Sequence, residues 1–323
     1  LLQTSGNLLA GGDVALDAKT LIDLDGTIGD TTAIGGAVTI GTTTEPSTGL
    51  DMASASLIDA TGDVTLKGGA LTLDEITSAG STGITATAST GTLTLNNNLT
   101  TTDGDDAGSI SLTATAGAIS NPSMITLDSD DNVVLTAGTG ISFASASTVQ
   151  ADDDITIDGG GTTGTNTLSL GILSSGQDAG AGNLVIGGTD SDPNVVLAGS
   201  VTATGGYVDV RGNDVTLSAD LTAGAANSEV GVNIDATNNI ELAGTVTTSA
   251  DAGKDVDIDA GNEFTLSSGG IDSDDAIFIT ATSDDVNLAV NLEADGLIDL
   301  DAGANLLQTS GNLLAGGDVA LDA

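Results

Sequence analysis

The chain lacks several of the residue types on which protein chemistry most often depends. Its 323 residues include no cysteine, no histidine and no tryptophan, and only one tyrosine and three phenylalanines. Without cysteine there is no disulfide framework, so the folded state must be stable without one. Without histidine and cysteine, the commonest catalytic bases and thiol nucleophiles are missing as well. These absences argue against an enzyme.

Positive charge is nearly absent too. Four basic residues, Lys19, Lys67, Arg211 and Lys254, stand against 46 acidic ones, which gives a formal net charge of −42 at pH 7. A chain this acidic repels nucleic acid and anionic membranes, and it can form few salt bridges. No apolar run approaches the roughly 18 residues of a membrane-spanning helix, and these residues include no signal peptide. We therefore expect neither nucleic acid nor a membrane span.

The residues that are abundant favour strands and turns. Hydrophobic residues make up 39% of the chain, and almost all of them are Ala, Val, Ile and Leu. That is enough for a core, so disorder is not expected despite the charge. The 46 glycines, together with Asn, Asp, Ser and Thr, are typical of tight turns between short β-branched strands.

The first 18 residues recur without a change as the last 18. Leu1–Ala18 and Leu306–Ala323 both read LLQTSGNLLAGGDVALDA. Self-similarity at a fixed period is the signature of a repeat architecture. It predicts that residues 1–305 are one complete tandem-repeat unit of a continuous solenoid and that residues 306–323 start the next copy. We expect the chain to be an excerpt whose end coils are covered by neighbouring repeats.

A shorter period lies inside the long one. Pairs of aliphatic residues in the pattern apolar–x–apolar, typical of a strand with one buried face, recur every 20–29 residues. The first members of these pairs are Val14, Val38, Val64, Ile84, Ile110, Val133, Ile155, Leu184, Val208, Val230, Val256, Ile277, Ile298 and Val319. This spacing predicts about 13 coils in each 305-residue unit, in the range of stacked solenoid repeats.

Each coil carries two further aliphatic positions. The second series starts at Ile22, Leu71, Leu93, Ile141, Leu168, Val195, Val215, Ile240, Phe264 and Val286. The third series is Ile28, Leu57, Ile76, Leu99, Ile125, Val149, Ile172, Val201, Leu221, Val246, Ile271, Leu292 and Leu313. Three short strands per turn predict an all-β fold, a parallel β-helix with three faces. Its narrow interior, filled by Val, Ile and Leu, accounts for the missing aromatic rings.

Several phrases of the sequence resemble the central repeats of filamentous haemagglutinin-like secreted adhesins. They are GDVTLKGGALTL (residues 62–73), DNVVLTAGTGISF (131–143), GNDVTLSADLTAG (212–224) and KDVDIDAGNEFTLSSGG (254–270). The resemblance runs over nearly the whole chain, and its motif mostly reports the fold. It implies a right-handed parallel β-helix, secretion to the extracellular space or cell surface, a filamentous shape and a role in adhesion.

Acidic residues cluster where turns are expected, and carboxylates with turn carbonyls are the ligands that calcium prefers. The candidate metal ligands are Asp103, Asp105, Asp106, Asp128, Asp130, Asp131, Asp152, Asp153, Asp154, Asp190, Asp192, Asp272, Asp274 and Asp275. None of these runs completes an EF-hand loop or a nonapeptide array. The alternative is that aspartate simply favours turns and solvates the surface. A repeat unit thirteen strand spacings of about 4.8 Å long would carry roughly one negative charge per 1.6 Å of its length, close to the charge density of B-DNA. Calcium or other cations are therefore expected at least as counterions.

Two smaller patterns bear on the outer surface. Thr-x-Thr pairs occur at Thr85–Thr87, Thr113–Thr115, Thr202–Thr204 and Thr280–Thr282, but at different offsets within their coils. We therefore expect them not to align into one flat ice-binding lattice. Asn96, Asn97, Asn98, Asn238 and Asn239 are expected to form stacked amide ladders in turns.

The sequence as a whole favours a structural segment of a long extracellular filament: a stalk, sheath or matrix fibre. Its expected partners are neighbouring copies of itself, joined covalently or head to tail. One alternative is an adhesin shaft or binding module that contacts surface glycans. The other is a β-helix polysaccharide-degrading enzyme, since paired carboxylates can hydrolyse glycosides. The enzyme alternative is weakened because Tyr207 is the only tyrosine and the chain offers few aromatic side chains on which a sugar could stack. With 46 acids, pairs of carboxylates also arise by chance, so such a pair is no evidence for catalysis.

Overall fold

The computed structural model describes residues 1–29, 33–41, 48–102, 107–160, 166–177, 182–188, 193–224, 230–249 and 254–323. Within these residues the chain forms 42 strands and no helix, so the prediction of an all-β chain is confirmed. It follows that no helix of the described part is long and apolar enough to cross a membrane.

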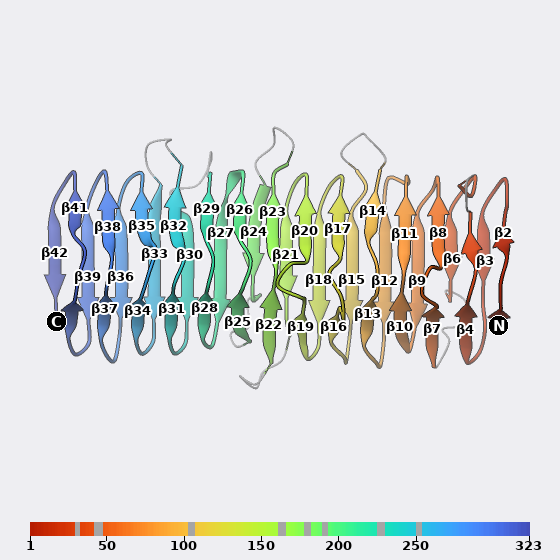
Figure 1. Cartoon of the computed structure of the whole chain (residues 1–323), viewed down its shortest axis with the longest axis horizontal. Coiled ribbons are helices and arrows are strands. Elements are labelled where there is room, and N and C mark those ends of the chain that lie inside the picture. Colours follow the sequence, from red (N-terminus) through yellow and green to blue (C-terminus); the bar gives the residue numbers. More distant parts are fainter. Residues whose placement is uncertain are drawn as a thin grey trace. The chain divides into compact units, whose positions relative to one another are not determined.

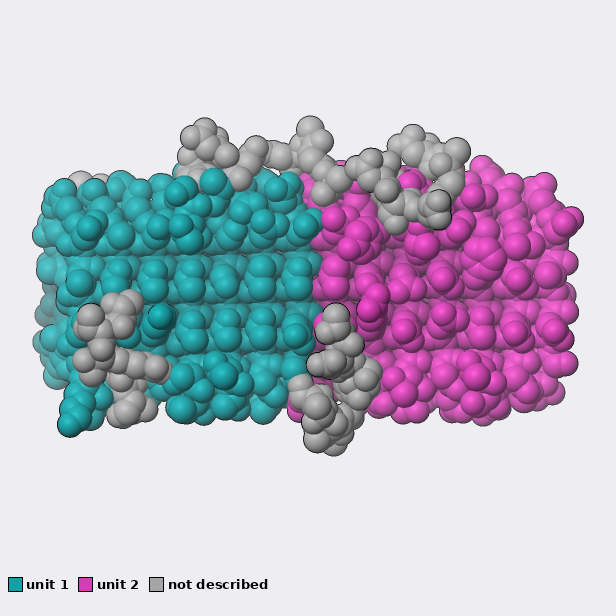
Figure 2. Space-filling view, turned by 180° about the vertical axis from the view of Figure 1, so that it is seen from behind, with its two compact units in different colours: residues 1–160 teal, residues 161–323 magenta. Residues whose placement is uncertain are grey.

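The chain divides into two compact units, residues 1–160 and 161–323 (Figure 2). In each unit the strands belong in turn to three parallel sheets, which we call A, B and C, so that three successive strands make one coil (Figure 1). Each unit contains seven such coils in its described residues. The three-faced parallel β-solenoid predicted from the sequence is therefore confirmed, while the direction of its winding remains a prediction.

Unit 1 contributes seven strands to each sheet. In sheet A they are β1 (Leu2–Gln3), β4 (Leu21–Leu24), β7 (Gly49–Met52), β10 (Ala70–Leu73), β13 (Leu93–Leu95), β16 (Ile119–Ser120) and β19 (Gly140–Ser142). In sheet B they are β2 (Asn7–Leu8), β5 (Thr27–Ile28), β8 (Leu57–Ala60), β11 (Glu75–Ser78), β14 (Leu99–Thr101), β17 (Thr126–Ser129) and β20 (Thr148–Ala151). In sheet C they are β3 (Val14–Leu16), β6 (Val38–Ile40), β9 (Val64–Gly68), β12 (Ile84–Ala88), β15 (Ile110–Ala114), β18 (Val133–Ala137) and β21 (Ile155–Asp158).

Unit 2 repeats the arrangement. Sheet A holds β22 (Thr167–Leu170), β25 (Asn194–Leu197), β28 (Val215–Leu217), β31 (Ile240–Leu242), β34 (Phe264–Leu266), β37 (Val286–Leu288) and β40 (Leu306–Gln308). Sheet B holds β23 (Ile172–Ser175), β26 (Val201–Ala203), β29 (Leu221–Ala223), β32 (Thr245–Thr248), β35 (Gly270–Ser273), β38 (Asn291–Ala294) and β41 (Leu313–Ala315). Sheet C holds β24 (Gly182–Ile186), β27 (Gly205–Gly212), β30 (Val230–Ala236), β33 (Asp255–Ala260), β36 (Ile277–Ala281), β39 (Ile298–Ala302) and β42 (Val319–Asp322).

The coil count agrees with the sequence. The last coil, β40–β42, has the sequence of the first, β1–β3, and thirteen coils run from the start of one to the start of the other. The division into a repeat unit, residues 1–305, and the start of a next copy, residues 306–323, remains a prediction.

Aliphatic side chains stack in rows inside each unit. In sheet C of unit 1, Ile84 pairs with Val64 on one side and with Ile110 on the other, and all three are fully buried. Strand pairing in register places every second residue inward, so one row continues through successive coils. At roughly 1.5–3 kcal/mol for each fully buried aliphatic side chain, these rows are the main source of stability.

Four positions in the predicted rows are corrected by the pairing. Ile58 and Leu173 are fully buried, whereas their neighbours Leu57 and Ile172 are half-buried. Where two aliphatic residues are adjacent, a one-residue slip exchanges the faces, and the pattern alone cannot decide between them. Similarly, Leu127 rather than Ile125 pairs with Leu99.

The fourth correction lies at an irregular strand pair. Val232, not Val230, pairs with Val208 and Val256, because the register shifts between Val230 and Val232. Such a bulge inserts residues on one strand and moves the next inward position along it.

Candidate functional site

Two features of the described residues can carry function: the coil that occurs twice, and the outward face of sheet C in unit 2. We call residues 1–18 the first copy and residues 306–323 the second copy of the repeated coil. The first copy comprises β1–β3 and stacks on β4–β6; the second comprises β40–β42 and stacks on β37–β39. The structure therefore contains both neighbours of one coil sequence.

The two copies share the turn that follows their first strand. In the first copy the Gln3 side-chain amide donates to the carbonyl of Gly6 at 2.9 Å, and in the second Gln308 donates to Gly311 at 3.1 Å. Gly6 and Gly311 have φ angles of 86° and 84°, in the left-handed region that glycine tolerates best. The side-chain amide of this glutamine is therefore hydrogen-bonded within its own turn, whether the neighbouring coil follows or precedes it.

The first copy contacts the coil that follows it. Leu8 pairs with Ile28 in sheet B, and Val14 pairs with Val38 in sheet C. The carboxylate of Asp13 accepts a hydrogen bond from the backbone N–H of Ala37 at 2.9 Å. Under this cover, Val14 is 7% exposed.

The second copy contacts the coil that precedes it. Leu313 pairs with Leu292 in sheet B, and Val319 pairs with Ile298 in sheet C. Val319, which corresponds to Val14, is 45% exposed. The repeated coil therefore has two apolar sides, and each is seen filled in one of the two copies.

The outward face of sheet C in unit 2 carries acids in two columns. Strands β27, β30 and β33 pair so that Asp209, Asn233 and Asp257 form one column and Arg211, Asp235 and Asp259 the other. We call these six residues the acidic columns. They alternate with the inward valines and isoleucines, as the two faces of a strand require.

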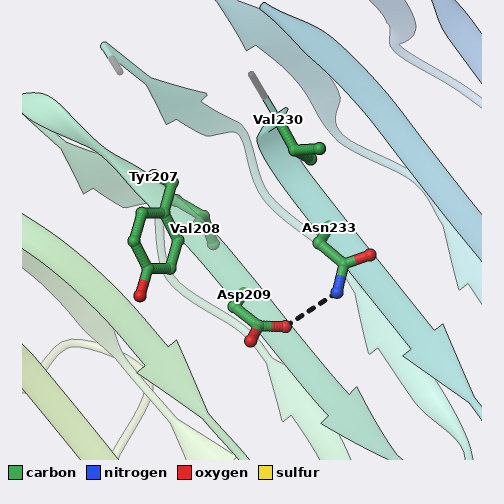
Figure 3. Close-up of a pocket in the computed structure, with 5 residues that line it drawn as sticks. All are labelled: Tyr207, Val208, Asp209, Val230 and Asn233. Atoms are coloured by element: carbon green, nitrogen blue, oxygen red, sulfur yellow. Dashed lines mark hydrogen bonds between the residues drawn. The ribbon is translucent and has the colours of Figure 1, made fainter. Parts of the chain in front are cut away.

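One ion pair lies within the acidic columns. The Arg211 guanidinium contacts Asp209 twice, with Nη2 to Oδ2 at 2.8 Å and Nε to Oδ1 at 3.1 Å. The Asn233 side-chain amide donates to the same Oδ1 at 2.9 Å (Figure 3). Arg211 is 43% exposed, so this pair contributes little, about 0–1 kcal/mol, to stability. Its effect is to fix the orientation of the Asp209 carboxylate.

The remaining acids repel one another. Partial burial raises the pKa of Asp257 above its ordinary value, and the negative charges of Asp259 and Asp255 raise it further. The pKa of Asp235 is raised by partial burial and by Asp259, against a lowering by Arg211. The columns therefore hold negative charge at an electrostatic disadvantage and favour protons or cations around them.

Sequence reasoning missed the acidic columns, although the signal was present. Asp209, Asn233 and Asp257 each follow an inward valine directly, and Arg211, Asp235 and Asp259 lie two residues further on. The candidate metal ligands are predicted in turns, where aspartate is commonest, whereas these acids lie on strands. Once the coils are aligned on their inward residues, the columns can be read from the sequence.

A shallow depression of about 280 Å³ lies beside the columns (Figure 3). Tyr207, Val208 and Asp209 of β27 line it together with Val230 and Asn233 of β30. The half-buried Tyr207, the Asp209 carboxylate and the Asn233 amide offer one flat apolar surface with donors and acceptors at its edge.

The aspartates predicted as calcium ligands in turns lie partly in turns and partly on strands. Asp131 accepts hydrogen bonds from the Ser109 hydroxyl and from the Asn132 amide, both at 2.6 Å. Asp128 is predicted in a turn, but it lies outward on β17, where its carboxylate accepts a hydrogen bond at 2.6 Å from the side-chain amide of its β20 partner Gln150. The backbone N–H groups of Asp152 and Asp153 donate to carbonyls of the coil before.

The other predicted ligands are dispersed. Asp272 lies outward on β35 beside Glu293, and the backbone N–H of Asp274 donates to the Thr248 hydroxyl at 2.9 Å. Asp130, Asp154 and Asp275 also lie in described turns, whereas Asp103, Asp105, Asp106, Asp190 and Asp192 lie outside the described residues. No group of three acids in the described part of the chain is arranged to hold a metal ion. Specific calcium binding stays a prediction.

Amide ladders form in unit 2, as expected of Asn238 and Asn239. The Asn238 amide donates to the Asn213 side-chain oxygen at 2.9 Å, and Asn213 donates to Asn194 at 3.0 Å. Asn262 donates to Asn239 at 2.9 Å. Asn98 instead accepts a hydrogen bond from the backbone N–H of Thr126 at 2.7 Å, so it caps the next coil rather than stacking on an amide.

A row of buried hydroxyls stabilises the corner between sheets B and C in both units. The Ser129 Oγ lies 2.9 and 3.0 Å from the carbonyl oxygens of Gly108 and Asn132, and the Ser273 Oγ lies 2.9 Å from those of Lys254 and Ala276, so each hydroxyl proton is shared between two carbonyls. Each hydroxyl joins the turn of its own coil to the turn of the coil before. This role is structural.

Comparisons with protein-family models, with curated proteins and with solved structures find no match to this chain. The resemblance to filamentous haemagglutinin-like adhesins therefore rests on the sequence phrases alone. The β-solenoid of stacked parallel coils to which those phrases point is the part that the structure bears out.

Proposed function

We propose that the chain is a structural segment of a long extracellular filament, a stalk, sheath or matrix fibre built from tandem β-solenoid repeats. The observation that supports this proposal is that the first copy of the repeated coil stacks on the coil that follows it, whereas the second copy stacks on the coil that precedes it. Combining the two contexts gives a coil covered on both sides, with residues 286–302 before it and residues 21–40 after it. No cap is needed at such a junction.

The rows of inward side chains remain continuous through this combined junction. In sheet C, Ile298 would be followed by Val319, which is also Val14, and then by Val38. In sheet B, Leu292 would be followed by Leu313, also Leu8, and then by Ile28. Because a solenoid is stabilised by contacts between neighbouring coils, a junction with normal neighbours is as stable as any other.

A chain of two units, residues 1–305 followed by 1–323, tests this proposal. If the coils continue through the junction, small-angle scattering should show the length increasing by about 62 Å, thirteen strand spacings of 4.8 Å, with an unchanged cross-section. The melting transition should not broaden. An increase in cross-section without an increase in length, or a separate early transition at the junction, would argue against a continuous shaft.

The net charge of the chain and its cellular location also belong to this proposal. The acidity of the chain supports a role in which copies repel laterally and remain dispersed, with calcium or sodium held as counterions. The absence of cysteine does not distinguish the inside of the cell from the outside, so the extracellular location is inferred from the sequence resemblance alone. Antibody labelling of intact cells that carry the gene would test it.

A binding module that contacts surface glycans is the second candidate, favoured by the depression at Tyr207. A sugar ring stacked on the phenol could hydrogen-bond to Asp209 and Asn233, which the Arg211 contact and the strand pairing hold in place. A glycan array with the chain and its Tyr207→Ala variant tests this. Binding that disappears in the variant supports the candidate, and equal binding or none rejects it.

A further inference from the structure

We propose that the depression at Tyr207 binds an organic cation, an ammonium group carried on a small apolar body. The cation contacts the tyrosine ring and is attracted by the carboxylates around the depression. This inference goes beyond the filament role and does not depend on it. It names the charge of the ligand, which the glycan candidate leaves open.

The depression lies where the outer surface of sheet C is irregular. The register shifts where β24 pairs with β27, between Gly182 and Leu184. It shifts again where β30 pairs with β33, between Val230 and Val232. Strands β27 and β30 each carry one extra residue at these points, and such bulges re-aim side chains and are common beside binding sites. Tyr207 and Val230, which lie at the two irregular points, both line the depression.

One side of the depression is aromatic. The Tyr207 ring stands across from Val230 and Asn233, with the Asp209 carboxylate at one end (Figure 3). The face of a tyrosine ring attracts a cation within about 6 Å of the ring centre. The volume is about 280 Å³, below the roughly 300–1,000 Å³ of sites for drug-sized ligands. The depression therefore fits a small group.

The charges around the depression favour a cation. Strands β27, β30 and β33 carry five aspartates and one basic residue, Arg211, a net charge of −4. Lys254, directly before β33, leaves this balance negative. The Arg211 guanidinium is engaged by Asp209 at 2.8 and 3.1 Å, so it offsets the charge of that carboxylate and leaves the others.

Two of those carboxylates stand on the β30 side of the depression. Asn233, which lines it, pairs with Asp257 of β33. Val230 pairs with Asp255 of the same strand. Partial burial raises the pKa of Asp257, and the charges of Asp259 and Asp255 raise it further, so these acids repel one another. An ammonium group in the depression, about one strand spacing of 4.8 Å away, reduces this repulsion.

An organic cation uses this lining more fully than a metal ion or a neutral sugar. A metal ion prefers several oxygen ligands around it, and no three acids among the residues that the structure describes are arranged to hold one. A neutral sugar stacks on the ring but gains nothing from the net charge of the neighbouring acids. An ammonium group on an apolar body interacts with the ring and with the carboxylates.

Tyr207 itself reports binding. The chain has no tryptophan and no other tyrosine, so its tyrosine fluorescence comes from this one ring. Titration of the full chain with choline should change that fluorescence and saturate at about millimolar concentration, as expected of a small ligand in a shallow site. The uncharged tert-butyl analogue of choline should require a concentration about tenfold higher.

Sodium chloride at equal ionic strength is the control for diffuse counterions, which a net charge of −42 attracts in any case. It should not reproduce the change in fluorescence. The absence of a saturating change with choline would overturn the proposal. The same change with sodium chloride, or an equal response to the uncharged analogue, would overturn it as well.

A second series of compounds distinguishes two sources of the cation. Glucosamine carries its ammonium group on a sugar, whereas choline carries it on a short alkyl chain. Tighter binding of glucosamine makes an amino sugar the preferred ligand, and tighter binding of choline makes it a quaternary ammonium group. Glucose and N-acetylglucosamine lack the charge. If they bind as tightly as glucosamine, the inference is rejected and the glycan candidate remains.

Matched variants locate the bound cation. Tyr207→Leu keeps an apolar side chain but removes the ring, so choline binding should weaken about fivefold. Broadening of the choline methyl signal in NMR measures this, since the variant has no tyrosine. Phe278→Leu is the control, because Phe278 also lies outward on sheet C, beside Asp257 and Asp299, but does not line the depression. Equal binding by the two variants would contradict the assigned site.

Asp257→Asn and Asp301→Asn change the net charge equally. Asp257 stands beside the depression, whereas Asp301 is on β39, two strands farther along sheet C than β33. We expect choline binding to weaken about threefold in the first variant, the size of an exposed charge interaction, and to stay unchanged in the second. Equal losses would show diffuse attraction by the whole chain and would reject the site.

This inference and the filament role can fail separately. A two-unit chain that lengthens as expected, combined with no choline binding, rejects the cation site and leaves the filament role in place. A two-unit chain whose junction melts early rejects the continuous shaft, whatever binds at Tyr207.

Discussion

Sheet C has the same interior but a different exterior in the two units. In unit 1 the column Thr87, Thr113 and Thr136 faces outward, whereas in unit 2 the equivalent column is Arg211, Asp235 and Asp259. The inward rows hardly differ: Ile84, Ile110, Val133 and Ile155 in one unit, and Val208, Val232, Val256 and Ile277 in the other. The aliphatic rows therefore specify the coil, and the outer columns are free to vary in charge.

The hydroxyl column of unit 1 agrees with the offsets read from the sequence. The pairs Thr85–Thr87 and Thr113–Thr115 are two residues out of register, since Thr87 pairs with Thr113 and Thr85 with Ser111. One threonine of each pair therefore joins a single column, and the two pairs do not stack on each other. Figure 2 shows how regular such rows of outward side chains are within each unit.

The largest expected effect comes from a charge placed in the inward rows. Ile110→Asp in unit 1 and Val256→Asp in unit 2 should each destabilise the chain by about 4 kcal/mol, because each buries an unpaired carboxylate. Thermal and urea denaturation would measure the loss, with the outward Thr113→Asp as control. If only one of the two inward variants were destabilised, the claim that both units share one interior would be broken.

A smaller effect is expected at the corner between sheets B and C. Ser129→Ala and Ser273→Ala should each cost about 1 kcal/mol, since the two carbonyls that each hydroxyl satisfies lose a donor. The exposed Ser142→Ala is the matched control. Equal stabilities of all three variants would show that the buried hydroxyls do not stabilise the fold.

Exchange of the outer columns tests the comparison directly. Thr87→Asp, Thr113→Asp and Thr136→Asp together should keep the fold but destabilise it by roughly 0.2–1 kcal/mol per adjacent pair of like charges. Added sodium chloride should restore part of the loss by screening. Asp235→Thr with Asp259→Thr should stabilise unit 2 in return. Unfolding of the triple variant at any salt concentration would show that the exterior does help to specify the coil.

The smallest effect concerns pH. The pKa values of Asp257 and Asp235 are raised in the folded state, so the folded chain binds more protons than the unfolded chain between the ordinary value of 3.8 and the raised values. Stability contributed by these groups should therefore fall as pH rises through that interval and increase on acidification toward it. Comparison with Asp257→Asn isolates the contribution, because the variant should be more stable at neutral pH and less sensitive to acid. An Asp257→Asn variant with the stability and pH dependence of the unsubstituted chain would contradict the assigned repulsion.

Much of this fold follows from the sequence. Rows such as Val64, Ile84 and Ile110 can be read from apolar–x–apolar spacing, because a half-buried strand must alternate. Positions such as Leu57 and Ile58 cannot, since only the pairing of neighbouring coils decides which of two adjacent aliphatic residues faces inward. The acidic columns join residues about 24 positions apart in the chain, so they can be read from the sequence only after the coils have been aligned on their inward residues.

An experimental structure that gives the separation between residues one coil apart would test whether the coils stack in register. We expect Cα–Cα distances of about 4.8 Å, one strand spacing, for the inward pairs Ile110–Val133 and Val256–Ile277 and for the outward pairs Thr87–Thr113 and Asp235–Asp259. All four pairs should belong to parallel strands. Antiparallel pairing, or a shift of register that turns Ile110 or Val256 toward solvent, would contradict this stacking.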